Sequence, residues 1–243
     1  MDFQEFSDFF NTVMSHNGFE SPVNEEQSRK FYFLMQHMLE TNKSMNLTAI
    51  KEEKAVILRH FLDSLTVVPF LPQNARILDV GCGAGFPCLP VGIFRPDLTI
   101  VALDSTEKRI RYVESTAKSL SLPHFTAIAA RAEDLAHQKQ YRAAFDVVTA
   151  RAVAALPVLS ELCLPFVRVG GSFIAMKATK GAEELAAAER GIARLGGEVA
   201  AVKNITLEGG GEHDERLLIE IKKVKQTPTD LPRAYAKIVK KPL

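Results

Sequence analysis

The stretch ILDVGCGAGFPCLP, residues 77–90, runs from apolar residues through an aspartate into three glycines at alternate positions. The apolar run predicts a buried strand, and the glycines predict a tight turn whose backbone approaches a ligand closely. The spacing excludes two common nucleotide loops. A nicotinamide fingerprint requires its third glycine where this chain has Phe86. A phosphate-binding P-loop requires a lysine followed by serine or threonine, and the segment GFPC has no lysine.

A different ligand, S-adenosylmethionine, suits this loop. The pattern Asp-x-Gly-x-Gly-x-Gly, which begins at Asp79, lets the backbone contact an adenosine that carries a methionine tail. The segment VALDS ends the next apolar run with Asp104, where nucleotide-binding folds place the acid that binds ribose hydroxyls. After the third apolar run, the segment RAEDL brings Ala132 and Glu133 to the expected position of the adenine. These three landmarks together predict a cofactor site at one edge of a sheet.

The chain after residue 72 alternates short apolar runs with helical segments, which predicts an α/β fold with a mostly parallel sheet covered on both faces. A glycine-rich turn over residues 208–215 then joins two further strands, which must be antiparallel because the connection is short. Residues 1–72 read as a small helical N-terminal extension, in which Asn24 is the expected start of one helix. The predicted strands cover residues 76–81, 98–104, 125–130, 145–150, 171–177, 198–207 and 216–224. The predicted units are therefore an extension (1–72), an α/β domain of seven strands (73–224) and a basic tail (225–243).

Composition narrows the class of protein. The 243 residues are 47% hydrophobic and 24% charged, which is typical of a globular protein. No apolar run approaches the roughly 20 residues of a membrane helix, and the start MDFQEFSDFF does not resemble a signal peptide. Three cysteines without a Cys-x-x-Cys pair suggest a reducing cytoplasm, and we expect no metal site and no membrane contact. The formal net charge is +1, but residues 222–243 contain seven Lys and Arg, a local basic region suited to a polyanion.

Several separate segments occur in the order and spacing of one known family: NLTAI (46–50), RHFLDSL (59–65), ILDVGCGAGFP (77–87), LDSTEKR (103–109), RAED (131–134), FDVVTARAVA (145–154) and the closing KKPL (240–243). They resemble the RsmG (GidB) methyltransferases, bacterial enzymes that transfer a methyl group from S-adenosylmethionine to N7 of one guanine in 16S ribosomal RNA. The resemblance implies a class I, Rossmann-like methyltransferase fold whose last strand is antiparallel. It also implies 16S ribosomal RNA or a small-subunit particle as the partner, and we expect a monomer.

The resemblance assigns roles to particular residues. Gly81, Phe86, Ala132, Glu133 and Arg151 fall on the cofactor contacts of the family. With the loop and the second strand end, the predicted cofactor-binding residues are Asp79, Gly81, Gly83, Phe86, Asp104, Ser105, Ala132, Glu133 and Arg151. Arg151 directly follows the fourth predicted strand and is also the candidate catalytic residue, as an aligner of substrate and cofactor with no general base assigned. The candidate substrate-binding residues are Arg131, Lys177 and Arg233.

The residues also bear on the target atom. Methylation of cytosine C5 needs a thiolate nucleophile, but Pro87-Cys88 follows the first strand, whereas that chemistry places the pair after the fourth. Methylation of an exocyclic amine uses an Asp/Asn-Pro-Pro-aromatic turn, and the segment TARAVA has none. Guanine N7 carries a free lone pair, so alignment with the methyl group suffices, and such positioning supplies roughly 7–11 kcal/mol.

Other classes remain open on the sequence alone. A methyltransferase of a small molecule or a protein would share the cofactor loop, and a ribosome-assembly factor without catalysis would retain a vestigial pocket. The role of His60 also remains open, between contact with substrate and helix packing. For Asp63 we expect an arginine partner in helix docking.

Overall fold

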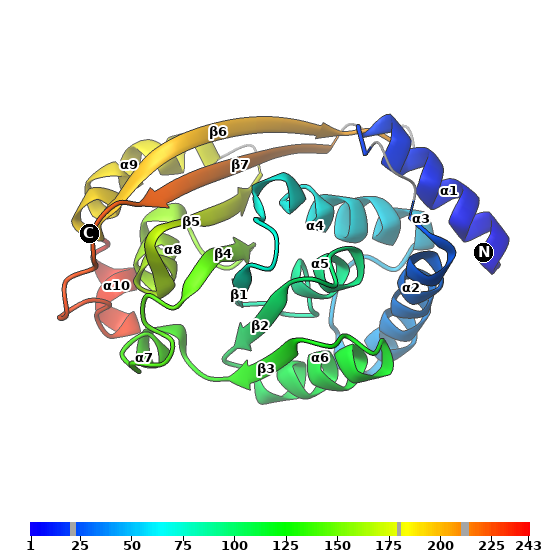
Figure 1. Cartoon of the computed structure of the whole chain (residues 1–243), viewed down its shortest axis with the longest axis horizontal. Helices are drawn as coiled ribbons and strands as arrows, with labels where there is room; N and C mark the ends of the chain where they lie inside the picture. The colour runs from blue at the N-terminus through cyan, green and yellow to red at the C-terminus, as the bar shows by residue number, and fades with distance from the viewer. Residues whose placement is uncertain (20–22, 179–180, 210–213) are drawn as a thin grey trace.

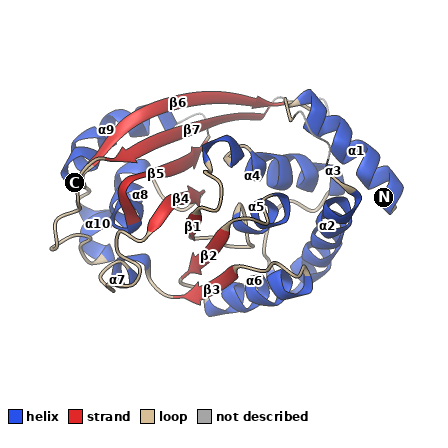
Figure 2. Cartoon of the chain, viewed as in Figure 1, coloured by secondary structure: helices blue, strands red, loops and turns tan. Residues whose placement is uncertain are grey.

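The described chain, residues 1–19, 23–178, 181–209 and 214–243 of a computed structural model, folds around a seven-stranded sheet (Figure 1). Strands and helices alternate along the chain from β1 to β6, as Figure 2 shows by colour. The strands are β1 (Arg76–Val80), β2 (Thr99–Asp104), β3 (Phe125–Ala129), β4 (Phe145–Arg151), β5 (Val167–Lys177), β6 (Gly197–Leu207) and β7 (Asp214–Lys223). Their order in the sheet is β3-β2-β1-β4-β5-β7-β6.

Strands β1 to β5 are parallel, and β7 is antiparallel to both β5 and β6. The expected seven-stranded α/β sheet with an antiparallel last strand is thus confirmed. Of the glycine-rich turn predicted to join β6 and β7, residues 210–213 lie outside the described residues. The strand order reverses between β1 and β4, and parallel sheets bind ligands beyond the carboxyl ends of strands at such a point.

The sheet separates two hydrophobic clusters, because neighbouring residues of a strand point to opposite faces. Ile77 of β1 belongs to one cluster and Leu78 to the other. The first cluster contains residues of α1 (Phe3–His16), α2 (Glu25–Met45), α3 (Glu53–Val56), the π-helix η1 (Ile57–Leu62), α4 (Asp63–Leu65), α5 (Cys88–Phe94) and α6 (Glu107–Ser119). The second contains residues of α7 (Ala132–Leu135), α8 (Leu156–Cys163), the 3-10 helix η3 (Leu164–Phe166), α9 (Gly181–Arg194) and α10 (Tyr235–Lys240). The N-terminal helices therefore share a core with the sheet.

Local sequence explains where these helices begin and end. Asn24 caps α2 as expected: its Oδ1 accepts from the Gln27 amide at 2.8 Å, while Gln27 Oε1 accepts from the Asn24 amide at 3.2 Å. Helix α7 is short and ends at Leu135. After it, turn hydrogen bonds such as Gln138 N to Leu135 O at 3.0 Å replace the helical pattern. A further short 3-10 helix, η2 (Val68–Phe70), leads into β1.

Candidate active site

The glycine loop follows β1 at the carboxyl edge of the sheet, where the sequence predicts it. Gly81 adopts a φ of 71°, and a Cβ there would lie 2.5 Å from Val153 Cγ2. Glycine is required because Val153, which follows β4, packs directly on the loop. Gly83 also has a positive φ of 56°, but a Cβ at this position would meet only the carbonyl oxygen of Gly81, at 3.9 Å. The loop is therefore tightly held at Gly81 and open to the outside at Gly83.

Two aspartates, Asp79 and Asp104, hold the loop through hydrogen bonds. Asp79 is 1% exposed, and its carboxylate accepts from Thr149 Oγ1 at 3.1 Å and from the Cys88 amide at 3.3 Å. Burial raises the pKa of Asp79 to about 6. Asp104 accepts from the Gly83 amide at 3.0 Å and from the Thr106 amide at 2.8 Å. Asp79 therefore supports the loop from inside, whereas Asp104 connects the loop to the end of β2.

A first cavity of about 240 Å³ opens beside this loop. The cavity is lined by the ends of β1 and β2, by the segments after β3 and β4, and by Tyr235 of α10. Five of the predicted cofactor residues line it together: Gly81, Asp104, Ser105, Ala132 and Glu133.

A second cavity lies on the other side of the segment that follows β4. It has a volume of about 660 Å³ and is lined by Ile50, Arg59, His60, Asp63, Arg151, Ala152, Met176, Lys177, Ala178, Glu184 and Arg216. Ala152 lines both cavities and adopts a φ of 55°, in the left-handed region that L-residues rarely occupy. Such strain clusters at functional sites. The two cavities are therefore neighbours that meet at one strained residue.

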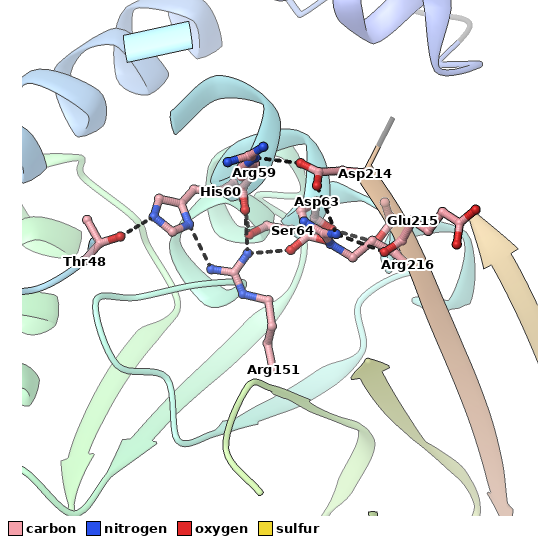
Figure 3. Close-up of polar contacts among 10 residues, drawn as sticks. Thr48, Arg59, His60, Asp63, Ser64, Arg151, Asp214, Glu215 and Arg216 are labelled. Carbon is pink, nitrogen blue, oxygen red and sulfur yellow. Dashed lines mark hydrogen bonds and ion pairs between the residues drawn. The ribbon is translucent and has the colours of Figure 1, made fainter. Parts of the chain in front are cut away.

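Arg151 is the centre of a polar network in the second cavity (Figure 3). Its Nη1 donates to Asp63 Oδ2 at 2.7 Å and to the carbonyl oxygen of Arg59 at 3.2 Å, and its Nη2 lies 3.2 Å from His60 Nδ1. Arg216 Nε donates to the other oxygen of Asp63 at 3.0 Å. Asp63 thus has two arginine partners, where the sequence predicts one. Residues of η1 and α4 fix the orientation of the Arg151 guanidinium directly, and Arg216 of β7 fixes Asp63.

His60 stacks on Phe86 while it supports Arg151. The two rings are 4.5 Å apart with 10° between their planes, and the Arg151 guanidinium lies 5.3 Å from the centre of the Phe86 ring. Burial and the neighbouring Arg151 lower the pKa of His60 to about 3. A neutral His60 that accepts from Arg151 at Nδ1 must donate from Nε2 to Thr48 Oγ1, at 2.8 Å. The imidazole is therefore held as an acceptor facing the arginine.

The lowered pKa of His60 predicts a pH-dependent stability. The neutral form is favoured in the fold, so this contribution is complete above the ordinary pKa of 6.5 and is lost as the pH falls towards about 3. Within that window, wild type should lose about 1.4 kcal/mol of unfolding free energy per pH unit relative to His60→Asn. Denaturant unfolding of both proteins across the window measures this difference. If the unfolding free energies of the two proteins changed in parallel with pH, His60 would not be held in the neutral form.

The chain matches the family model for rRNA small subunit methyltransferase G over residues 27–214. It is 41% identical to the ribosomal RNA small subunit methyltransferase G of Lactobacillus delbrueckii subsp. bulgaricus, over 97% of this chain and 98% of that protein. The chain belongs to the rRNA small subunit methyltransferase G family. The relative from Staphylococcus carnosus is 43% identical, over 91% and 92% of the two chains.

Solved structures confirm the class of fold for this family member. An O-methyltransferase from Bacillus cereus in complex with SAH superposes with a TM-score of 0.56 at 16% identity, over 91% of this chain and all of that one. A SAM-dependent methyltransferase from Methanosarcina mazei gives 0.52 at 14% identity, over 66% and 98%. The predicted Rossmann-like methyltransferase fold is therefore confirmed.

The remaining predicted residues of this family member have partners within the protein. Lys177 pairs with Glu184 at 2.7 Å and donates to the carbonyl oxygen of Ala154 at 2.8 Å, beside the second cavity. Arg131 lies at the first cavity, where its Nε donates to Glu133 at 2.9 Å. Arg233 lies elsewhere, in a pair with Glu161 at 2.6 Å. Phe86 lies against His60 and is not among the residues that line the first cavity.

Sequence reasoning missed several residues that line the two cavities. Val153 was quoted within a family segment, yet nothing in its identity revealed that it packs on Gly81. Arg216 lies on a strand 153 positions from Asp63, so only the folded sheet brings them together. Tyr235 was not considered because the tail was described only by its charge. It is the one aromatic residue among the tail lysines, which could have indicated a contact with a ligand.

Proposed function

We propose that this protein transfers a methyl group from S-adenosylmethionine to N7 of a guanine in 16S ribosomal RNA. The observation that carries the proposal is the junction of the two cavities at Ala152, because it offers adjacent places for a methyl donor and a target base. Membership of the family supports the reaction and the substrate class. The N7 position rests on the chemistry of the residues around the second cavity.

The first cavity has the features that an S-adenosylmethionine site needs. Asp104 offers a carboxylate at the end of β2 for ribose hydroxyls, and Gly83 leaves the loop open where a side chain would obstruct a ligand. Ala132 and Glu133 would lie beside the adenine, with Glu133 oriented by Arg131. When bound, the cofactor supplies the methyl group. The residues of the chain bind and orient it.

The cysteines of the protein do not suit nucleophilic catalysis. Cys82, Cys88 and Cys163 are all buried, and burial raises the pKa of Cys88 and of Cys163 well above the ordinary value. Thiols held in the neutral form are poor nucleophiles. A target atom that is already nucleophilic, such as guanine N7, is therefore favoured over cytosine C5.

Methyl transfer should survive replacement of all three cysteines. We expect Cys82→Ser, Cys88→Ser and Cys163→Ala together to lower stability by about 1–3 kcal/mol, because the thiols are buried, while folded protein retains its rate. Single-turnover methylation, normalised to the folded fraction, measures this. A folded variant without activity would restore a cysteine nucleophile to the mechanism.

Arg151 would act as the aligner of the base. Its guanidinium is fixed by Asp63 and His60 at one end of the second cavity, beside Ala152. From this position a donor could bind an acceptor on the Hoogsteen edge of guanine, such as O6, and hold N7 towards the first cavity. Alignment of this kind needs no proton removed from the base, which agrees with a neutral His60 that is already engaged.

One experiment tests the proposal against its rivals. Ribosomal RNA from a strain without the gene is incubated with tritiated S-adenosylmethionine, and the labelled base is mapped. Label at one guanine N7 of 16S RNA supports the proposal. Label on protein or small molecules alone would support another methyltransferase. Cofactor binding without any transfer would support an assembly factor that does not catalyse.

The basic tail would form the outer part of the RNA surface, with Arg131, Arg151 and Lys177 as its inner part. Lys237, Lys240 and Lys241 are exposed, whereas the charge of Arg233 is paired with Glu161. Phosphate contacts of this kind position an RNA without reading its sequence.

Replacing Lys237, Lys240 and Lys241 with Gln should weaken RNA binding and reduce its salt dependence. Each lost phosphate contact lowers the slope by about 0.7 for single-stranded RNA, so up to about 2 is expected for three. Turnover at saturating RNA should change little. The exposed lysines Lys43, Lys108 and Lys118, on helices α2 and α6, give a matched control triple. An unchanged slope in the tail variant would assign the lysines no RNA contact.

Location and assembly are proposed on the same basis. Within the described residues, none of the helices has the length and apolar character needed to cross a membrane. The three buried free thiols favour a reducing compartment, so we propose a cytoplasmic location; the monomer expected from the sequence stays a prediction.

A further inference from the structure

The basic segment after β7 packs on the second face of the sheet. Leu231 and Ile238 are fully buried in the cluster formed by α8 and its neighbours. Arg142 donates to the carbonyl oxygens of Leu231 at 2.9 Å, Thr227 at 3.0 Å and Pro228 at 2.8 Å. The path of the segment is therefore fixed by both apolar burial and charge-assisted hydrogen bonds.

A buried glutamate fixes the segment just before α10. Glu161 of α8 is completely buried, and its Oε1 accepts from the Arg233 amide at 2.8 Å and from Arg233 Nε at 2.9 Å. Its Oε2 accepts from Arg233 Nη2 at 2.6 Å. His137 Nε2 lies 2.9 Å from the carbonyl oxygen of Pro232. These contacts hold the start of α10 in one position relative to α8.

The consequence is that Tyr235, the first residue of α10, reaches the first cavity. Its ring lines the cavity and is 39% exposed. The Arg131 guanidinium lies 4.4 Å from the centre of the ring, and Arg131 is itself held by Glu133. An exposed aromatic residue that lines a pocket beside a cation offers a surface for a flat ligand group.

The ligand group is identified by its neighbours. The β2 end, with Asp104, suits the ribose, and the segment after β3, with Ala132 and Glu133, suits the purine. Tyr235 contacts Arg131, the residue directly before that segment. We propose that Tyr235 stacks on the purine of S-adenosylmethionine, so that the docked C-terminal segment completes the cofactor site. This inference rests on the proposed function, because it takes the first cavity as the site of that cofactor.

Calorimetric titration of wild type, Tyr235→Phe and Tyr235→Ala with S-adenosylhomocysteine tests the inference. Stacking needs the ring and not the hydroxyl, so Tyr235→Phe should bind like wild type. Loss of one base–aromatic stack should weaken Tyr235→Ala by about 5- to 150-fold. The same loss is expected with methylthioadenosine, which has the purine and ribose without the amino acid. Equal binding by wild type and Tyr235→Ala would overturn the inference.

Two controls separate this result from other causes. Val239→Ala changes an exposed residue of the same helix, so it should keep wild-type affinity unless loosening of α10 is the cause. RNA affinity is measured in parallel: weakened RNA binding with unchanged cofactor binding in Tyr235→Ala would make Tyr235 an RNA contact and overturn the proposal. If wild type itself binds no S-adenosyl compound, the proposed function fails instead.

Fluorescence gives an independent measurement. The chain contains no tryptophan, so Tyr235→Trp introduces a single indole at the cavity. We expect saturating S-adenosylhomocysteine to quench or shift its emission, because stacking on a purine changes the environment of the indole. Unchanged emission in a protein that calorimetry shows to be saturated would contradict the stack.

Discussion

Gly83→Val is expected to abolish binding of S-adenosylmethionine while the protein remains folded. A Cβ at Gly83 would clash with nothing in the protein, so the added branches would project into the open space beside the loop. The Gly83 amide donates to Asp104 Oδ2 at 3.0 Å, and Asp104 lines the first cavity. We therefore expect the valine side chain to lie beside the proposed ribose site. The positive φ of Gly83 adds a strain of about 1–2 kcal/mol for any L-residue. Calorimetry should detect no binding, and thermal unfolding should show a modest loss of stability.

A matched control distinguishes obstruction from strain. Gly170 also has a positive φ, of 87°, and a Cβ there would approach only the end of the Arg168 side chain, at 3.5 Å. Gly170→Val should therefore lose similar stability and keep full affinity for the cofactor. If Gly83→Val bound as tightly as Gly170→Val, the loop would not contact the ligand.

The parts of the fold that the sequence predicted well are those encoded locally. Strands β1 and β2 were predicted from continuous apolar runs. A strand of a parallel sheet that is buried on both faces does not alternate apolar and polar residues. Asn24 marked a helix start because a capping box involves residues three apart. The tight turn after β1 was also predictable, because glycine adopts the positive φ values that such a turn requires.

The features that the sequence could not predict depend on contacts between distant segments. Nothing near Arg233 indicates its partner Glu161, which lies 72 positions away and is buried in another helix. The tail was described by its charge, but Leu231 and Ile238 decide its position because their burial fixes the path of the backbone. His60 of η1 and Asp63 of α4 lie three positions apart and can share a helix face, but their common partner Arg151 lies 88 positions after Asp63, which residue spacing does not reveal.

Arg151→Ala is expected to cut turnover by at least about a hundredfold at saturating RNA and cofactor. Misplacement of reacting groups by about 1 Å has an effect of this size, and the proposed role of Arg151 is to hold the base beside Ala152. Arg151→Lys should be impaired nearly as much. A lysine keeps the charge, but it cannot reproduce the fork that reaches Asp63 and His60 together.

Stability has to be separated from this loss of rate. The Arg151 and Asp63 side chains are only 15% and 5% exposed, so loss of the pair should destabilise the protein, although Arg216 remains beside Asp63. Rates are therefore measured in single turnovers, per folded molecule, below the melting temperature of each variant. Arg168→Ala is the control, because Arg168 pairs with Asp146 at the other end of the sheet, at 2.6 Å. An Arg151→Ala protein that turns over as fast as Arg168→Ala would remove Arg151 from the reaction and leave it a purely structural residue that joins β4 to the N-terminal helices.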